Sequence, residues 1–253
     1  MKFSIITCTY NSREYLSDTI NSVKSQTEKD FEHIFIDGGS TDGTLEMIDS
    51  YKKEFPEKVR RYQQKPQGIS GAMNYGVEKS KGEIICHLHS DDLFCSKDVL
   101  RIASKVFSEN KDLRWAYGKL EIINPDGSRY NLENPPEFSA KRLFSLNFIP
   151  HPATFVKRDF FNQLGGFSGY KYAMDYDLWL RASLLATPKK INHCISKFRR
   201  HPGGASTKWY LNTLKEDYMV RMQYTPKKMR LLFFMQYRFR VSKFILSKWL
   251  GRA

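Results

Sequence analysis

Two carboxylates stand side by side in the segment HLHSDDLF, residues 87–94, directly after an apolar run. Unpaired neighbouring carboxylates repel each other, and an apolar setting makes the repulsion worse. A bound cation would remove this conflict between Asp91 and Asp92. Paired carboxylates select a hard, oxygen-preferring ion such as Mg²⁺ or Mn²⁺ rather than zinc, and such ions are usually shared with phosphate oxygens.

Polar residues also end two other predicted strands. Thr9, Tyr10 and Asn11 close the region of FSIITCTY, and Asp37 with Gly39 follows the run FEHIFI. Each cluster alone also suits a turn or a helix cap. In an open parallel α/β sheet, however, ligands bind beyond the carboxyl ends of the strands. The three strand ends are therefore expected to form one pocket, in which Asp37 accepts hydrogen bonds from a base or a ribose.

The segment PQGISGAMN adds a glycine-rich start of a helix, where free N–H groups face an anion. Its glycines also suit a purely conformational role. Neither a Walker A pattern nor GxGxxG occurs, which argues against a P-loop NTPase and a dinucleotide dehydrogenase. A nucleoside diphosphate held by a divalent ion remains as the ligand.

Strands and helices alternate through the first 110 residues or so, which predicts βαβ units and a mainly parallel, Rossmann-like sheet flanked by helices. The pattern changes after LRWAYGKLEII, where NPDGS predicts the turn of an antiparallel hairpin. We expect helices near 139–146 and across 175–187, and a strand near 194–199. The fold class is therefore α/β with a small antiparallel portion.

The 253 residues suit one α/β domain with or without an appendage, and 41% apolar content supports a sizeable core. The four cysteines show no paired short spacing, which favours a reduced cytosolic protein with core thiols over disulfides or a zinc site. The N-terminus predicts a first strand rather than a signal peptide. No stretch approaches the roughly 18 apolar residues of a membrane-spanning helix.

The positive charge concentrates in a tail. Residues 225–253 hold eight Lys or Arg and no acid, which leaves +6 of the net charge of +14 for the other 224 residues. On a helical projection one side carries Phe234, Tyr237, Val241, Phe244 and Ile245. This pattern favours attachment to an anionic membrane, with a helix packed on the domain as the alternative. No motif supports nucleic-acid binding.

Five motifs follow one another in a familiar order: SIITCTYNSREYLSDTINSVKSQT, FIDGGSTDGT, QGISGAMNYGV, GEIICHLHSDDLF and MDYDLWLR. In this order, over about residues 3–207, the chain resembles family 2 glycosyltransferases with the GT-A fold. With HPATFVKRDFFNQLGGF and HPGGAST it is similar to the bacterial exopolysaccharide branch, including colanic-acid-type enzymes. The resemblance implies an inverting transfer of a sugar from a UDP-, GDP- or dTDP-sugar to an acceptor hydroxyl.

The resemblance also assigns binding residues. Those matching the nucleoside pocket are Thr9, Tyr10, Asn11, Asp37 and Gly39, and those bordering the ribose or donor sugar are Gly68 and Asn74. Asp91 and Asp92 match the metal and ribose motif, but His89 occupies its usual first acidic position, so either aspartate is a candidate ligand for Mn²⁺ or Mg²⁺. His201 is expected to reach the diphosphate or the metal from a loop, the alternative being a plain loop histidine.

Asp175 matches the catalytic base of the family, which takes the proton of the acceptor hydroxyl. A cap at the start of a helix is its structural alternative, and both roles are compatible. Met174 replaces the glutamate that often precedes this aspartate, so a helper role is lost or passes to Asp177. For His151, a structural role is preferred to one in the acceptor site.

These features predict a GT-A catalytic domain over 1–207, with a nucleotide-binding half (1–110) and an acceptor-side half (111–207), and a basic amphipathic helical tail over 208–253. We expect a metal-dependent, hexosyltransferase-type enzyme of bacterial surface polysaccharide synthesis, cytoplasmic and peripheral at the inner face of the plasma membrane. Its acceptor would be a glycan or a lipid-linked sugar.

Two rival functions are weaker. A sugar-1-phosphate nucleotidyltransferase needs a glycine-rich, basic loop near the N-terminus, which TCTYNSREY lacks. A non-catalytic nucleotide-sugar-binding or membrane scaffold subunit has no use for a base such as Asp175.

Overall fold

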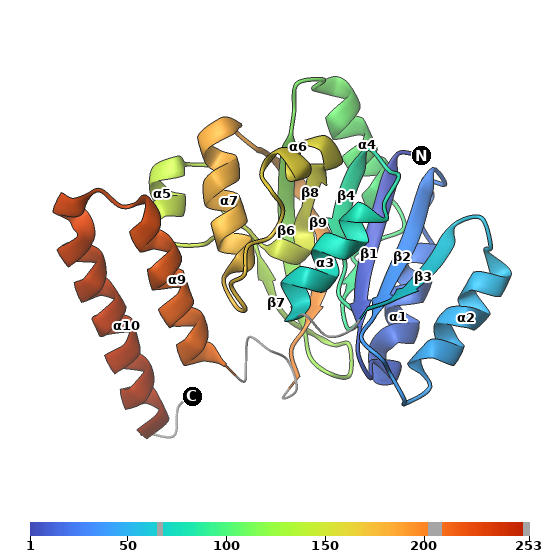
Figure 1. Cartoon of the computed structure of the whole chain (residues 1–253), viewed down its shortest axis with the longest axis horizontal. Coiled ribbons are helices and arrows are strands. Elements are labelled where there is room, and N and C mark those ends of the chain that lie inside the picture. Colours follow the sequence, from blue (N-terminus) through green and yellow to red (C-terminus); the bar gives the residue numbers. More distant parts are fainter. Residues whose placement is uncertain (65–67, 202–208, 250–253) are drawn as a thin grey trace.

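The computed structural model describes residues 1–64, 68–201 and 209–249. In these ranges the strands form one sheet in the order β3-β2-β1-β4-β8-β6-β9-β5, with β7 paired to β6 (Figure 1). The strands are β1 (Phe3–Thr9), β2 (Phe31–Asp37), β3 (Val59–Gln63), β4 (Ile84–His87), β5 (Leu93–Phe94), β6 (Trp115–Ile123), β7 (Arg129–Glu133), β8 (Thr154–Lys157) and β9 (Lys189–Arg199). The helices are α1 (Arg13–Lys24), α2 (Thr44–Glu54), α3 (Gly68–Glu78), α4 (Val99–Glu109), α5 (Ala140–Ser145), α6 (Arg158–Gln163), α7 (Met174–Leu185), α9 (Tyr210–Tyr224) and α10 (Arg230–Trp249).

The half of the sheet formed by β1 to β4 is parallel, as the alternation of strands and helices predicts. β1 is buried along almost its whole length, because helices cover both faces of the sheet. Ile6 packs on one face with residues of α3 and α7, whereas its neighbour Ile5 packs on the other with residues of α1 and α4. The carboxyl ends of β1, β2 and β4 thereby meet at one edge.

The other half contains the antiparallel pairs. β8 lies between β4 and β6 and runs antiparallel to both, and β6 and β7 form the expected hairpin. The α/β class with a sheet flanked by helices is confirmed. β8 and α6 were not expected, because each contains at most six residues and carries no clear period.

The prediction that the cysteines are reduced thiols was wrong for one pair. Cys95 and Cys194 form a disulfide with their Cα atoms 5.8 Å apart. Cys95 directly follows β5 and Cys194 lies in β9, and these two strands pair although 99 residues separate the cysteines. The spacing in the sequence therefore hid their proximity. Cys8 and Cys86 are free thiols, as expected.

The C-terminal segment forms two helices, α9 and α10, which lie side by side at the end of the molecule opposite β3 (Figure 1). Tyr218 stacks on Tyr237 with 4.8 Å between ring centroids and also contacts Phe234, and Tyr210 contacts Phe244. The apolar arc predicted for this helix therefore contacts α9. No helix in the described part of the chain is long and apolar enough to cross a membrane. The predicted boundary between residues 207 and 208, like most of HPGGAST, lies outside the described residues.

Candidate active site

Two adjoining cavities open at the carboxyl ends of the parallel strands. The first, of about 480 Å³, is lined by Cys8, Thr9, Tyr10, Ile36, Asp37, Gly38, Gln64, Gly68, Ile69 and Ala72. The second, of about 580 Å³, includes His89, Ser90, Asp91, His151, Lys171, Tyr172, Met174, Asp175 and Thr213 in its lining. Cys8 and Ile69 line both cavities, so one ligand can extend from the first into the second.

Asp37 lies at the base of the first cavity and is fully buried. Its Oδ1 accepts hydrogen bonds from the main-chain N–H of Gly39 and Ser40, and its Oδ2 accepts from the hydroxyls of Thr9 and Ser40. Burial would raise the pKa of Asp37, but the hydrogen bonds from Ser40, Thr9 and Gly39 outweigh it and lower the pKa. Asp37 is therefore an ionised carboxylate that shapes the loop after β2.

Tyr10 lines this cavity and is 65% exposed, so its ring is accessible to a base that would stack on it. Asn11 and Gly39 do not line the cavity. Both have positive φ angles, 49° and 96°, and Asn11 ties the two strand ends together by accepting a hydrogen bond from the N–H of Thr41. These two residues set the loop conformations beside the cavity.

Gly68 begins α3 with φ of 78° and lines the first cavity, whereas Asn74 lines neither cavity. Both polar atoms of the Asn74 amide bond the main chain of Phe167, at 2.9 Å each. Asn74 therefore holds the loop before α7 against α3. The resemblance to the family placed Asn74, like Gly68, beside the ribose or donor sugar, because both residues belong to the motif QGISGAMNYGV.

The two adjacent aspartates point in different directions. Asp92 is fully buried, and its Oδ1 accepts a hydrogen bond of 3.1 Å from the main-chain N–H of Arg199. Burial, followed by the charge of Asp91, raises the pKa of Asp92 well above its usual range. Asp91 is partly exposed at the second cavity, and its Oδ2 lies 2.9 Å from Nε2 of His201.

Arg199 fixes this turn and was not anticipated from the sequence. Its guanidinium is almost fully buried and donates to the carbonyl oxygens of Asp91 and Pro125 and to the carboxylate of Asp18. It also lies over the ring of Tyr15, at 4.6 Å. These contacts join α1, the β6–β7 hairpin and the Asp91–Asp92 turn. In the sequence, Arg199 was indistinguishable from the basic residues around it.

Asp91 and His201 are placed so that each can supply one ligand atom to the same divalent cation. A carboxylate oxygen and an imidazole nitrogen face each other at hydrogen-bond distance, and Asp91 is accessible from the cavity. Two protein ligands leave several positions for phosphate oxygens and water, which is the usual arrangement when Mg²⁺ or Mn²⁺ is shared with a nucleotide. The burial of Asp92 leaves its carboxylate outside this arrangement.

Asp175 is in the first turn of α7 and lines the second cavity. Asn147 donates to its Oδ2 at 3.4 Å, and the N–H of Tyr176 donates to its Oδ1 at 2.7 Å. Burial outweighs these hydrogen bonds and raises the pKa of Asp175 to about 6. A carboxylate with a pKa near neutrality is suited to take up a proton during a reaction.

The other acids near Asp175 differ in their surroundings. Asp177 is buried, pairs with Arg181 at 2.7 Å and accepts a hydrogen bond from the hydroxyl of Tyr224, so it is occupied structurally. Asp217 of α9 does not line the cavity but is mostly buried. Burial and then the charge of Asp175 raise the pKa of Asp217 to about 7.

Three histidines stack beside this cavity. His151 lies between His87 and His89, with ring centroids 5.5 and 5.3 Å apart, and both of its ring nitrogens lack a hydrogen-bond partner among the described residues. Burial lowers the pKa of His151 well below its usual range, so the imidazole is neutral. His151 thus lines the cavity, at a position where the sequence favoured a structural role.

A helix-flanked, largely parallel sheet with cavities at the carboxyl ends of β1, β2 and β4 is the architecture of the GT-A fold. The profile described as Glycosyl transferase family 2 matches residues 4–179. The chain belongs to this family.

Curated relatives agree with this assignment. The chain is 32% identical over 218 residues to the chondroitin synthase and to the hyaluronan synthase of Pasteurella multocida. These matches cover 86% of the chain but only 22% of each synthase, so the chain spans about a fifth of their length. An uncharacterized glycosyltransferase of Mycobacterium tuberculosis, Rv1514c, is 29% identical over 201 residues, or 77% of this chain and 74% of that protein.

Solved structures share the fold. Staphylococcus aureus TarS 1-349, in complex with UDP-GlcNAc, superposes with a TM-score of 0.70 over 87% of this chain and 66% of that chain, at 19% identity. The mannosyltransferase PcManGT of Pyrobaculum calidifontis, in complex with GDP-Man and Mn²⁺, gives a TM-score of 0.66 over 93% and 69%, at 15% identity.

The raised pKa of Asp175 predicts a stability effect that depends on pH. A carboxyl group whose pKa is higher in the folded than in the unfolded protein stabilises the fold. This stabilisation is fully present below the pKa of the unfolded state, about 4. It is lost as the pH rises through the folded-state pKa of about 6. Asp175→Asn cannot ionise, so we expect a higher melting temperature than that of the wild type at pH 8 and a similar one at pH 4.

Asp177→Asn is the matched control from the same helical turn. It breaks a buried ion pair with Arg181 and should lower the melting temperature at pH 8. Thermal unfolding of the three proteins at both pH values is the measurement. An Asp175→Asn protein that is less stable than the wild type at pH 8 would contradict the environment described for this carboxylate.

Proposed function

We propose that the chain transfers a sugar from a nucleotide diphosphate sugar to an acceptor hydroxyl with inversion at the anomeric carbon. The observation that carries the proposal is the pair of joined cavities. The first has a buried carboxylate and an exposed aromatic ring, suited to a nucleoside. The second contains Asp91 and Asp175, suited to a diphosphate and to a reacting sugar, respectively.

The donor is drawn from the UDP-, GDP- and dTDP-sugars. TarS has been solved with UDP-GlcNAc, and PcManGT with GDP-Man and Mn²⁺, so the shared fold accommodates more than one base. Asp37 does not by itself select a base, because its oxygens already accept four hydrogen bonds from the protein. We therefore propose that Tyr10 stacks on the base and that the cavity wall selects it.

In the reaction, ionised Asp175 accepts the proton of the acceptor hydroxyl while that oxygen bonds to the anomeric carbon. The bond from this carbon to the diphosphate oxygen breaks on the opposite face, and its electron pair leaves with the nucleoside diphosphate, so the configuration inverts. Asp91 and His201 would hold a Mn²⁺ or Mg²⁺ ion, which when bound offsets negative charge on the leaving diphosphate. Asn147 orients the carboxylate of Asp175.

The first test is donor turnover. Wild-type protein is incubated with UDP-, GDP- and dTDP-sugars, Mn²⁺ and a panel of alkyl glycosides as acceptors, and released nucleoside diphosphate is measured. Asp175→Asn should bind the donor with the wild-type Kd, whereas transfer should fall by a factor on the order of 10² to 10⁴, the usual contribution of a general base. Asp112→Asn, an exposed aspartate, is the control. Wild-type transfer by Asp175→Asn would overturn the assignment of the base.

We further propose that the acceptor is part of a bacterial surface polysaccharide, either a glycan or a lipid-linked sugar at the inner face of the plasma membrane. The Pasteurella relatives are named as synthases of two polysaccharides, which supports the first part. The surface of α10 supports the second. Leu231, Met235, Phe239 and Leu246 recur along one side of α10, and each is more than half exposed, with Leu231 at the edge next to α9.

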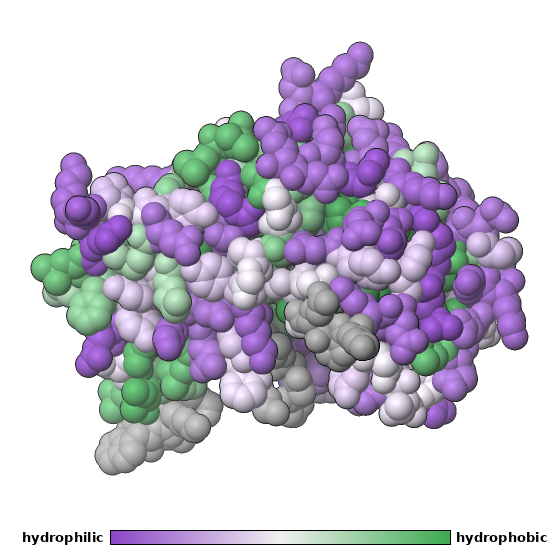
Figure 2. Space-filling view, viewed as in Figure 1, coloured by the Kyte–Doolittle hydropathy of each residue, from purple (hydrophilic) through white to green (hydrophobic). Residues whose placement is uncertain are grey.

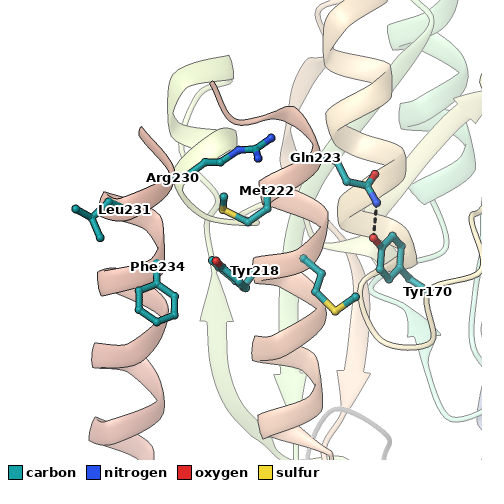
Figure 3. Close-up of a pocket in the computed structure, with 8 residues that line it drawn as sticks. Tyr170, Tyr218, Met222, Gln223, Arg230, Leu231 and Phe234 are labelled. Carbon is teal, nitrogen blue, oxygen red and sulfur yellow. Dashed lines mark hydrogen bonds between the residues drawn. The ribbon is translucent and has the colours of Figure 1, made fainter. Parts of the chain in front are cut away.

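Figure 2 shows hydrophobic side chains at the α9–α10 end of the molecule, with hydrophilic side chains between them. A groove of about 650 Å³ lies between the two helices and is lined by Tyr218, Leu231 and Phe234 among others. Figure 3 shows how these side chains lie. Arg238 and Lys243 lie on either side of this exposed face of α10 on a helical projection, and no acidic residue occurs after Asp217. An apolar face with cationic borders matches a helix that lies in an anionic bilayer surface.

Vesicle sedimentation tests this attachment. The wild type should sediment with phosphatidylglycerol vesicles at low salt, and less so with phosphatidylcholine or at high salt, because each basic residue adds about 1 kcal/mol at an anionic surface. Replacing Leu231, Met235 and Phe239 with Ser should abolish sedimentation. Leu184→Ser with Leu185→Ser, which changes equally exposed leucines on α7, is the control. Equal sedimentation of both variants would contradict the proposed surface.

A further inference from the structure

The N-terminus of α7, which carries Asp175, has no capping side chain of its own. The residue at the cap position is Ala173, whose methyl group accepts no hydrogen bond, and the first N–H groups of a helix have no partners within the helix. Glu216 of α9 instead supplies an acceptor for the N–H groups of the N-cap residue Ala173 and of Tyr172, the residue before it. Its Oε2 accepts from the N–H of Tyr172 at 2.6 Å and from the N–H of Ala173 at 3.1 Å.

α9 also contacts this region at two other points. Gln223 donates to the hydroxyl of Tyr170 at 2.5 Å (Figure 3), and Tyr224 donates to Asp177 at 2.9 Å. The main chain is thus held two residues before Asp175 and a side chain is held two residues after it. All of these contacts come from a helix that begins at residue 210, beyond the 4–179 range that the family profile matches.

The charges facing Asp175 come partly from the same helix. Asp217, next to Glu216, has a pKa raised to about 7 by burial and by the charge of Asp175, while Arg240 and Arg221 oppose this shift. A displacement of α9 would therefore change both the position of Asp175 and its electrostatic surroundings. Misplacement of a catalytic group by about 1 Å costs on the order of 100-fold in rate.

We propose that Glu216 is a positioning residue for the catalytic base: by accepting the N–H groups of Tyr172 and Ala173, it holds the start of α7 where Asp175 faces the cavity. The proposal rests on the proposed function, because it takes Asp175 as the base. It makes α9 part of the active site, whereas the sequence indicated only an appended tail. Glu216 itself lies outside the lining of the cavity and acts through the main chain.

Two substitutions separate the hydrogen bonds from the charge. Glu216→Gln keeps an oxygen that accepts both N–H groups, whereas Glu216→Ala removes it. We expect kcat of the Ala variant to fall on the order of 100-fold with the KM for the donor unchanged, and kcat of the Gln variant to stay close to wild type. Glu78→Ala, an exposed glutamate on α3, is the matched control.

The pH profile distinguishes positioning from a general loss of structure. Wild-type kcat should rise with pH through about 6, where Asp175 ionises. In Glu216→Ala this rise of kcat should occur at lower pH. A loosened α7 exposes Asp175 to water and removes the burial that raises the pKa of its carboxyl group. Wild-type kcat and pH profile in the Ala variant would overturn the proposal, as would equal losses in the Gln and Ala variants.

Hydrogen exchange gives a readout that does not depend on turnover. The N–H groups of Tyr172 and Ala173 should exchange faster in Glu216→Ala than in the wild type or in Glu216→Gln. Unchanged exchange would overturn the proposal. A wild-type protein that releases no nucleoside diphosphate, yet shows this exchange pattern, would refute the proposed function and leave the contact between Glu216 and α7 standing.

Discussion

The buried guanidinium of Arg199 is the interaction on which the rest of the site depends. A buried charge is tolerated only when it is paired and fully hydrogen-bonded. Arg199 meets this condition through Asp18, Pro125 and the main-chain oxygen of Asp91, and its own N–H bonds Asp92. This network turns one aspartate inward and leaves the other at the cavity, so the adjacent carboxylates do not compete for one position.

The proposed mechanism also requires a base that is buried enough to take up a proton. Burial raises the pKa of Asp175 and costs stability once the carboxylate ionises. The fold offsets this cost with contacts around α7 rather than at the carboxylate itself. Trp179, one turn further on, stacks on Trp115 with 5.3 Å between ring centroids, and α9 holds the start of the helix. The position of the proposed base and the packing of the C-terminal helices are therefore linked.

The sequence predicts what depends on local pattern and on parallel topology. Thr9, Asp37 and Asp91 lie at neighbouring strand ends as expected, because apolar runs of strand length alternate with helices. It does not predict contacts between distant segments. Three such contacts each join residues more than 40 positions apart: the disulfide of Cys95 and Cys194, the hydrogen bonds of Arg199, and those of Glu216 at the start of α7. No periodic pattern in the sequence indicates these contacts.

Metal-dependent nucleotide binding by two single variants tests the division of labour between the aspartates most directly. Calorimetric titration of UDP, GDP and dTDP, each with and without Mn²⁺, first identifies the nucleotide that the wild type binds. Asp91→Asn should lose the dependence of that binding on Mn²⁺. Asp92→Asn, which keeps an oxygen for the N–H of Arg199, should retain it. The reverse result, or wild-type binding that ignores Mn²⁺, would contradict the proposed cation site.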